Sequence, residues 1–346
     1  NETCRFPMDE ALGLLRGVSP AVAARACRQA ALAPFDEASE TCGILSGTRM
    51  SADRIRAIAE SMRGAADEFL DNAMTPESKR PACVVVEVDG KGAPLRRREL
   101  EAAGAKGKGE DGVAKTREVK VGAIFSFTPN PGEGEPPQRD ADSTRYRLST
   151  QTADDFGEEL WHDFEARFPG EPPLTLFISD AAAGILNIRS NWFPFAVGII
   201  DVNHATEHLG AVLDACGFAV KSKERDGEFK KWRAWLLAGK VEEIILEAEG
   251  RSVDADACDK ALRYFREGKP FMRYAQYRAK GWFIGSGVIE GACKNVVAER
   301  FCRSGMFWSG SGLDAMLPLR AIVKSGRYAA FWEHVLRGRR QIVCAA

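Results

Sequence analysis

The stretch ACVVVEVDG, residues 82–90, predicts the buried strand around which the rest of the fold is arranged. A run of β-branched residues that ends at a glycine is typical of a strand in a protein interior. Alternation along such a strand places Val85, Glu87 and Asp89 on one face and the even-numbered valines on the other. An acid, Asp89, therefore stands at the end of a mostly apolar strand.

Three further segments have strand character: residues 117–127, 173–180 and 195–201. The last two each end in an acid, Asp180 and Asp201, and helical patterns cover 154–168 and the residues after Asp201. Strands that alternate with helices in this way predict an α/β fold with a mixed sheet.

The segments before and after these strands are predicted to be helical. Residues 1–80 form an N-terminal helical region, in which 35–70 outline a helix-turn-helix with Ser51 as the cap of its second helix. Such a second helix can lie in the major groove of DNA, although short helical hairpins also occur in many proteins that never bind it. Residues 216–280 are rich in Lys, Glu and Trp and have no strand signal.

The composition is that of a globular protein of two or three domains. The chain has 346 residues, of which 45% are hydrophobic and 28% charged. No apolar run is long enough to span a bilayer and no signal-peptide pattern opens the chain, so a cytoplasmic setting is expected. The nine cysteines include no Cys-x-x-Cys pair, which disfavours a zinc knuckle. Beyond Lys280 basic residues outnumber acids, which suits a polyanionic partner or a solvated helix face.

A third acid stands in an unusual setting. In FIGSGVIEGACKN, residues 283–295, Glu290 lies among small and apolar residues at the start of a predicted helix, where a buried acid needs a partner. Asp89, Asp180 and Glu290 would repel one another on meeting unless a cation bound them. Their oxygen ligands suit Mg²⁺ or Mn²⁺, and two such ions about 4 Å apart catalyse phosphodiester chemistry. Alternatively, the two aspartates merely cap the helices or turns that follow them.

The order of several motifs resembles that of the ISKra-type insertion-sequence transposases of bacteria. The motifs are VEVDG, REVKVG, ISDAA, IIDVNHATEHL, IGSGVIEGACKNVV and RSGMFWSGSGLDAMLPLR, and the resemblance covers nearly the whole chain. It implies an RNase H-like core in 81–215 and 281–346, interrupted by a helical insertion at 216–280. It also implies a DDE triad of Asp89, Asp180 and Glu290 at a two-metal Mg²⁺ or Mn²⁺ site. The partners would be transposon-end and target DNA, bound by a homo-oligomer at the bacterial nucleoid, and no membrane.

The sequence departs from this family pattern at a few positions. Ala181 replaces an expected glycine after the second aspartate, and Cys302 replaces a basic residue. Of the paired cysteines expected upstream of FPMDEALGL only Cys4 is present, which suggests that the chain is truncated. A domesticated DNA-binding derivative without catalytic activity is therefore an alternative to an active transposase.

Candidate DNA contacts follow the Glu290 helix. Arg300 and Arg303 lie about one helical turn apart and can contact phosphate, and Trp308 can stack on an unpaired base. A solvated helix face for the arginines and core packing for the tryptophan are the competing interpretations.

The motif HATEH, residues 204–208, offers a function of another class. Its His-x-x-Glu-His spacing is that of inverted zinc metalloproteases, with both histidines on one helix face. If the chain is instead a transposase, we expect His204 and His208 to point away from the three acids. Asp201 should then lie outside that cluster and cap the helix that follows it.

Overall fold

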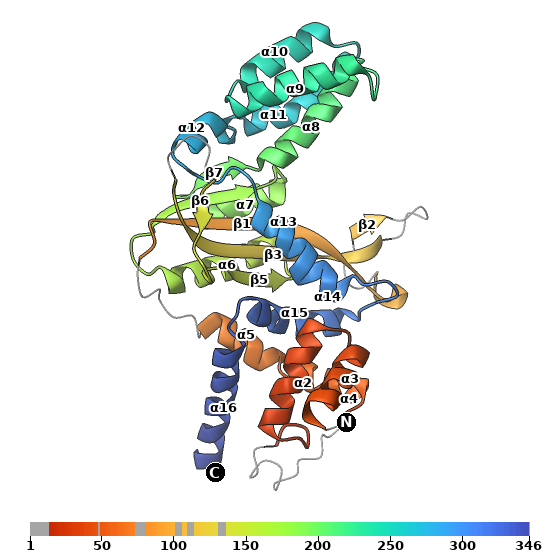
Figure 1. The fold of residues 1–346 in the computed structure, drawn as a ribbon, viewed down its shortest axis with the longest axis vertical. Helices are drawn as coiled ribbons and strands as arrows, with labels where there is room; N and C mark the ends of the chain where they lie inside the picture. Colours follow the sequence, from red (N-terminus) through yellow and green to blue (C-terminus); the bar gives the residue numbers. More distant parts are fainter. Residues whose placement is uncertain are drawn as a thin grey trace.

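The fold is built around one mixed β-sheet with helices against both faces (Figure 1). The computed structural model describes residues 14–47, 49–72, 80–100, 106–108, 114–130 and 136–345. The strands are β1 (Cys83–Pro94), β2 (Lys106–Lys108), β3 (Ala114–Thr128), β4 (Gln138–Arg139), β5 (Arg145–Ser149), β6 (Leu174–Ser179) and β7 (Val197–Ile200). This arrangement confirms the predicted α/β class with a mixed sheet.

Among the described residues the sheet has the order β2-β3-β1-β6-β7, with β4 and β5 also paired to β3. Strand β3 is antiparallel to both β1 and β5, whereas β1, β6 and β7 run parallel to one another. Strand β1 does not end at Gly90, as the sequence pattern suggested, because β3 continues to pair with it as far as Pro94. Asp89 therefore lies within β1, at the level where the shorter strand β6 ends.

The two faces of the sheet are covered as the alternation along β1 predicts. Val84, Val86 and Val88 pack in a core with residues of α6 (Ala153–Arg167) and α7 (Ala183–Trp192). Cys83 and Val85 face a second core, which includes residues of α8 (Val202–Ala215). Glu87 and Asp89 have the same parity as Val85 and share that second face.

Two helical groups extend from opposite edges of the sheet, one beyond β7 and the other beyond β5 (Figure 1). One follows α8 and consists of α9 (Lys223–Leu237), α10 (Val241–Arg251), α11 (Ala255–Gly268), η2 (Lys269–Phe271) and α12 (Tyr274–Ala279). The other consists of α2 (Pro20–Leu32), α3 (Phe35–Ser46), α4 (Ala52–Glu60) and α5 (Arg63–Asn72), packed against α15 (Gly310–Lys324) and α16 (Tyr328–Ala345). As predicted, the Ser51 side chain caps α4 by accepting a hydrogen bond from the Arg54 N–H.

One nearly continuous helix crosses the sheet between these groups. It comprises α13 (Gly287–Ala292), the π-helical turn η3 (Cys293–Ala298) and α14 (Glu299–Phe301), whose junctions keep helical backbone angles. The loop before it depends on Gly281, which has φ +68°; a Cβ atom there would lie 2.2 Å from the Asn130 carbonyl carbon. Within the described part of the chain, no helix combines the length and apolar character needed to cross a bilayer.

Candidate active site

Three aspartates lie in a row where the parallel strands end. Val88 pairs with Ser179, and Ser179 pairs with Ile200, so the next residues in the same register are Asp89, Asp180 and Asp201. Because paired positions of parallel strands project to the same face, Asp89 and Asp180 point to one side of the sheet. That side is the face that α13 crosses (Figure 1). Ligand sites of open α/β sheets gather at this edge.

Asp89 and Asp180 interact electrostatically. Burial raises the pKa of Asp180, and the negative charge of Asp89 raises it further, while the Ala182 N–H that donates to Asp180 Oδ1 at 3.0 Å opposes the rise. Asp89 Oδ1 accepts from the N–H of Gly90 at 2.7 Å. Neither aspartate has an ion-pair partner among the described residues, so a cation would relieve their mutual repulsion.

Glu290 is exposed, in contrast to the burial that its apolar neighbours suggest. Ile289 and Ala292 face the core and turn Glu290 outward from α13. Its carboxylate nevertheless faces the end of the sheet: a Glu290 oxygen, an Asp201 oxygen and a His204 nitrogen all lie within 4.8 Å of one another. The acid in the apolar stretch thus has its neighbours at the carboxyl ends of the strands.

Cys293 links the Glu290 helix to β1. It lies three residues beyond Glu290, and its thiol donates to Asp89 Oδ2 at 3.3 Å. Burial raises the pKa of this thiol, as do the charges of Asp89 and Glu290, so Cys293 remains a neutral donor. The π-helical turn begins at the same residue, and such turns within α-helices are frequent at functional sites. Cys293 thus connects Asp89 to the helix that carries Glu290, whereas the potential metal-binding group among the described residues includes Glu290 but neither Asp89 nor Asp180.

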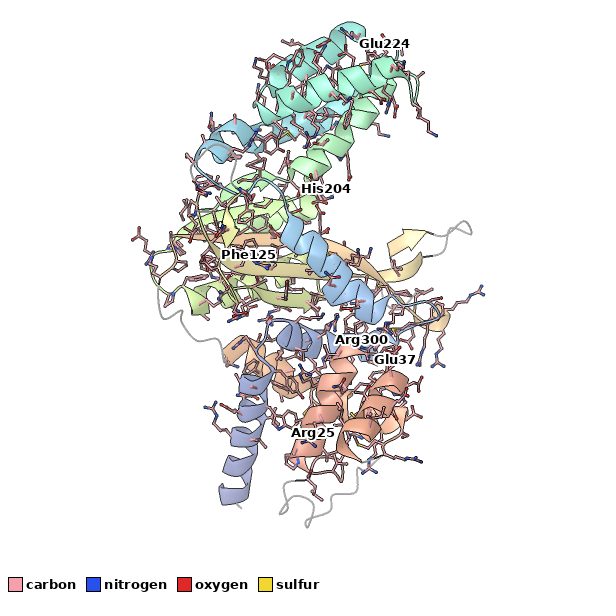
Figure 2. The ribbon with its side chains drawn as sticks, viewed as in Figure 1. Arg25, Glu37, Phe125, His204, Glu224 and Arg300 are labelled. Carbon is pink, nitrogen blue, oxygen red and sulfur yellow. The ribbon has the colours of Figure 1, made fainter. Side chains whose placement is uncertain are left out.

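Asp201 and His204 do not lie where the sequence interpretation put them. Asp201 caps α8 as predicted, accepting from the N–H groups of Asn203 and His204, but it is not outside the acidic cluster. His204 also approaches the cluster instead of pointing away, and Figure 2 shows it near the start of α13. Its Nδ1 lies 3.8 Å from Asp201 Oδ1, is buried and has no hydrogen-bond partner in the described part of the chain. The sequence contains a signal for the position of Asp201, because Asp201 directly follows β7 just as Asp180 directly follows β6.

His208 interacts electrostatically with His204 and Asp180, but it is not part of this cluster. Its ring stacks on Tyr264 with 3.7 Å between centroids, and burial lowers its pKa. The potential metal-binding group of three that the described residues contain joins His204 to Asp201 and Glu290, not to His208. A zinc site that uses both imidazoles of the HATEH motif is therefore not among the potential metal-binding groups of the described residues.

The three acids of the predicted triad carry donors that fit a hard divalent cation. Asp89, Asp180 and Glu290 offer carboxylate oxygens, which Mg²⁺ and Mn²⁺ prefer. Asp201 lies close to Glu290, but its carboxylate oxygens are already engaged in hydrogen bonds. Its Oδ1 accepts from Asn203 and His204, and its Oδ2 accepts from the N–H and hydroxyl of Ser286. These four donors occupy the lone pairs of an ionised carboxylate, so Asp201 has none left for a metal.

A fifth acid, Glu87, lies behind the site on β1. It is fully buried, and its Oε2 accepts from the Ile289 N–H at 2.7 Å, while its Oε1 has no hydrogen-bond partner among the residues that the structure describes. Burial raises the pKa of Glu87 to about 8, and the charges of Asp201 and Glu290 contribute in the same direction. Sequence reasoning placed Glu87 on the correct face but gave it no role.

Arg300, Arg303 and Trp308 lie away from the acids, at the junction with the N-terminal helices. Arg300 is fully buried between the rings of Phe35 and Trp308, and its Nε donates to the Ala30 carbonyl at 2.8 Å. Burial lowers its pKa to about 9. Trp308 is 6% exposed, whereas Arg303 is partly exposed and pairs with Glu37 at 2.6 Å. Figure 2 shows Arg300 and Glu37 at this junction. Arg300 and Trp308 thus pack in the interior in this conformation.

The departures from the family pattern are accommodated locally. Ala181 is not among the described non-glycine residues with positive φ, so the turn after Asp180 does not require a glycine. Cys302 donates through its thiol to the Gly92 carbonyl at 3.3 Å. Cys4 and most of FPMDEALGL lie outside the described residues.

Comparison with known proteins gives little further information. No protein-family model matches the sequence, and no curated protein matches it. Among solved structures, the chain is similar to one titled Drosophila P element transposase strand transfer complex. The identity is 10%, the match covers 85% of this chain and 84% of the other, and the TM-score is 0.23. That score is too low to assign a fold or a function.

Proposed function

We propose that this protein is a metal-dependent polynucleotidyl transferase, a DDE transposase that cuts and rejoins DNA. The observation that carries the proposal is the placement of three acids. Asp89 and Asp180 follow paired positions on adjacent parallel strands, and the helix bearing Glu290 crosses the same face, where Cys293 contacts Asp89. Carboxylates from two strands and one helix around a shared volume are what a two-metal site requires.

The sheet topology supports the same function. The order β5-β3-β1-β6-β7, with only β3 antiparallel, is consistent with the RNase H-like core that the motif resemblance implies, and α9–α12 lie within the predicted insertion before the Glu290 helix. The motif resemblance to ISKra-type transposases points the same way. The zinc metalloprotease alternative lacks support, because the potential metal-binding group among the described residues includes His204 but not His208.

The roles of the residues follow from their positions. Asp89, Asp180 and Glu290 would hold Mg²⁺ or Mn²⁺, which when bound activates the attacking oxygen and stabilises the leaving oxygen of a phosphodiester. The Cys293 thiol orients the Asp89 carboxylate, and the Ala182 N–H orients that of Asp180. The attacking group would be water in the first step and a DNA 3′-hydroxyl in the second. Glu290 is exposed, so a DNA strand would not need to enter the core to reach it.

The test is cleavage of DNA carrying the ends of the element that encodes the protein. We expect cleavage to require Mg²⁺ or Mn²⁺ and to be abolished by Asp89→Asn, Asp180→Asn and Glu290→Gln. Each change removes a charged ligand and nearly preserves shape. Glu333→Gln is the matched control, because Glu333 is 73% exposed on α16, far from the site.

The outcomes separate the alternatives. Wild-type activity in any of the three site variants would remove that residue from the triad. Sequence-specific DNA binding without metal-dependent cleavage would identify a non-catalytic DNA-binding derivative instead.

A further inference from the structure

The helix that carries Glu290 has no side-chain cap of its own. Its N-cap residue is Ser286, and the Ser286 side chain makes no capping hydrogen bond to the helix. The first N–H groups of a helix need acceptors, and a side chain at the N-cap position usually supplies one. In this helix a local cap is replaced by two acids from distant strands.

The first of these acids is Glu87 on β1. Its Oε2 accepts from the N–H of Ile289, the third residue of α13, at 2.7 Å. The two residues are 202 positions apart in the chain, and Glu87 is 0% exposed. Because Ile289 directly precedes Glu290, this hydrogen bond fixes the backbone from which the Glu290 side chain projects.

The second acid is Asp201 at the end of β7. Its Oδ2 accepts from both the N–H and the hydroxyl of Ser286, and Asp201 is also fully buried. The Val202 N–H also donates to the Ile284 carbonyl at 3.0 Å. The loop before α13 is therefore joined to the start of α8 both through Ser286 and through Ile284. Asp201 thus holds the starts of α8 and α13 together.

We propose that Glu87 and Asp201 are positioning residues, which anchor the first turn of α13 to β1 and β7 and thereby set Glu290 against Asp89 and Asp180. The proposal rests on the proposed function. Without the anchors, α13 would be held near Asp89 chiefly by Cys293 and its apolar side chains. Outer groups that orient metal ligands commonly contribute 10- to 100-fold to metal affinity.

The test measures Mn²⁺ binding to the full chain by electron paramagnetic resonance, in parallel with amide hydrogen exchange of residues 287–292. Glu87→Met removes the acceptor while nearly preserving volume, and Ser286→Ala removes one donor to Asp201. We expect both variants to bind Mn²⁺ about 10-fold or more weakly and to exchange faster in this segment. Glu87→Gln keeps an oxygen that accepts from Ile289 and should restore both properties.

The matched control is Ser126→Ala. Ser126 is a buried serine on β3 whose hydroxyl donates to Asp140 Oδ2 at 2.6 Å, at the opposite end of β1 from Asp89. It should leave Mn²⁺ affinity and the exchange of 287–292 unchanged. Tight Mn²⁺ binding and slow exchange in both Glu87→Met and Ser286→Ala would overturn the proposal.

The two proposals fail in different ways. If wild-type protein binds no Mn²⁺, or Asp89→Asn binds it equally well, the proposed metal site is wrong. Hydrogen exchange then still decides whether the acids anchor α13: faster exchange in Glu87→Met, reversed in Glu87→Gln, supports the anchoring, and unchanged exchange rejects it.

Discussion

At the scale of single residues, the carboxyl of Glu159 on α6 offers a direct link between burial and pH. Burial raises its pKa from 4.5 to about 7; Arg147 opposes the rise, while Asp71 and Asp163 add to it. In the unfolded chain the pKa returns to its ordinary value. Between these two values the folded protein binds the proton more tightly than the unfolded chain, so stability falls as pH rises through this window.

Replacing Glu159 with Gln should remove this pH dependence. We expect the free energy of unfolding of Glu159→Gln, relative to wild type, to rise by roughly 3 kcal/mol between pH 4.5 and pH 8. Urea denaturation at several pH values measures the difference. The neighbouring Glu158 is exposed, and Glu158→Gln should give a difference that changes little with pH. A constant difference for Glu159→Gln would show that its carboxyl ionises alike in both states.

At the scale of elements, much of the sheet could be predicted because its strands are short apolar runs. The ends of β1 could not, since they depend on how far β3 continues to pair with it. Asp89 and Asp180 were identifiable as acids that follow apolar runs. Asp201 gives the same signal, but its contact with Ser286, 85 positions away, is set by the tertiary fold.

The burial of Arg300 could not be predicted either, because it also depends on contacts between distant parts of the chain. Charge and helical spacing predict an exposed cation on a helix face. The residues that enclose it, Phe35 and Ala30, lie about 270 positions earlier in the chain. No local sequence pattern indicates such a contact. Arg300 is therefore buried by tertiary packing, although its sequence neighbours predict an exposed side chain.

The second helix of the predicted helix-turn-helix is α4. Ile55 and Ile58 face the core, whereas Arg54 and Arg56 lie on the other side. Arg54 donates to the carbonyls of Arg16 and Gly17, while Arg56 is 41% exposed and pairs only with the nearby Asp53 at 2.9 Å. Arg56 is thus the better candidate for a DNA contact on the second helix of the predicted helix-turn-helix.

If α4 lies in a groove of DNA, Arg56→Gln should weaken binding. It should also lower the slope of log affinity against log salt by about 0.9, the effect of one lost phosphate contact. Fluorescence anisotropy with labelled duplex at several salt concentrations measures both quantities. Arg251→Gln on α10 is a control of similar exposure, 43%. An unchanged slope in Arg56→Gln would place DNA recognition on another element.

At the scale of the whole molecule, β1 joins the three hydrophobic cores. Ala93 belongs to the core shared with the N-terminal helices and α15, Val85 to the core under α8–α12, and Val84 to the core under α6 and α7. A strand common to all three cores couples their packing. We therefore expect the molecule to unfold as one cooperative unit.

Arg320 on α15 tests that coupling, because it joins the N-terminal helices to the Glu290 helix. It is fully buried and donates to the carbonyls of Ala31 on α2, Val296 and Asn295, at 2.7–2.8 Å. Arg320→Met leaves these carbonyls without their donor, which should lower the free energy of unfolding by about 3–5 kcal/mol. Circular dichroism and tryptophan fluorescence should then report the same, lower denaturation midpoint.

The control is Arg337→Met, at a side chain that is 74% exposed, which should change the free energy of unfolding by no more than about 0.5 kcal/mol. Two separate transitions in Arg320→Met, one for the helices and one for the sheet, would show that the N-terminal helices fold independently of the site.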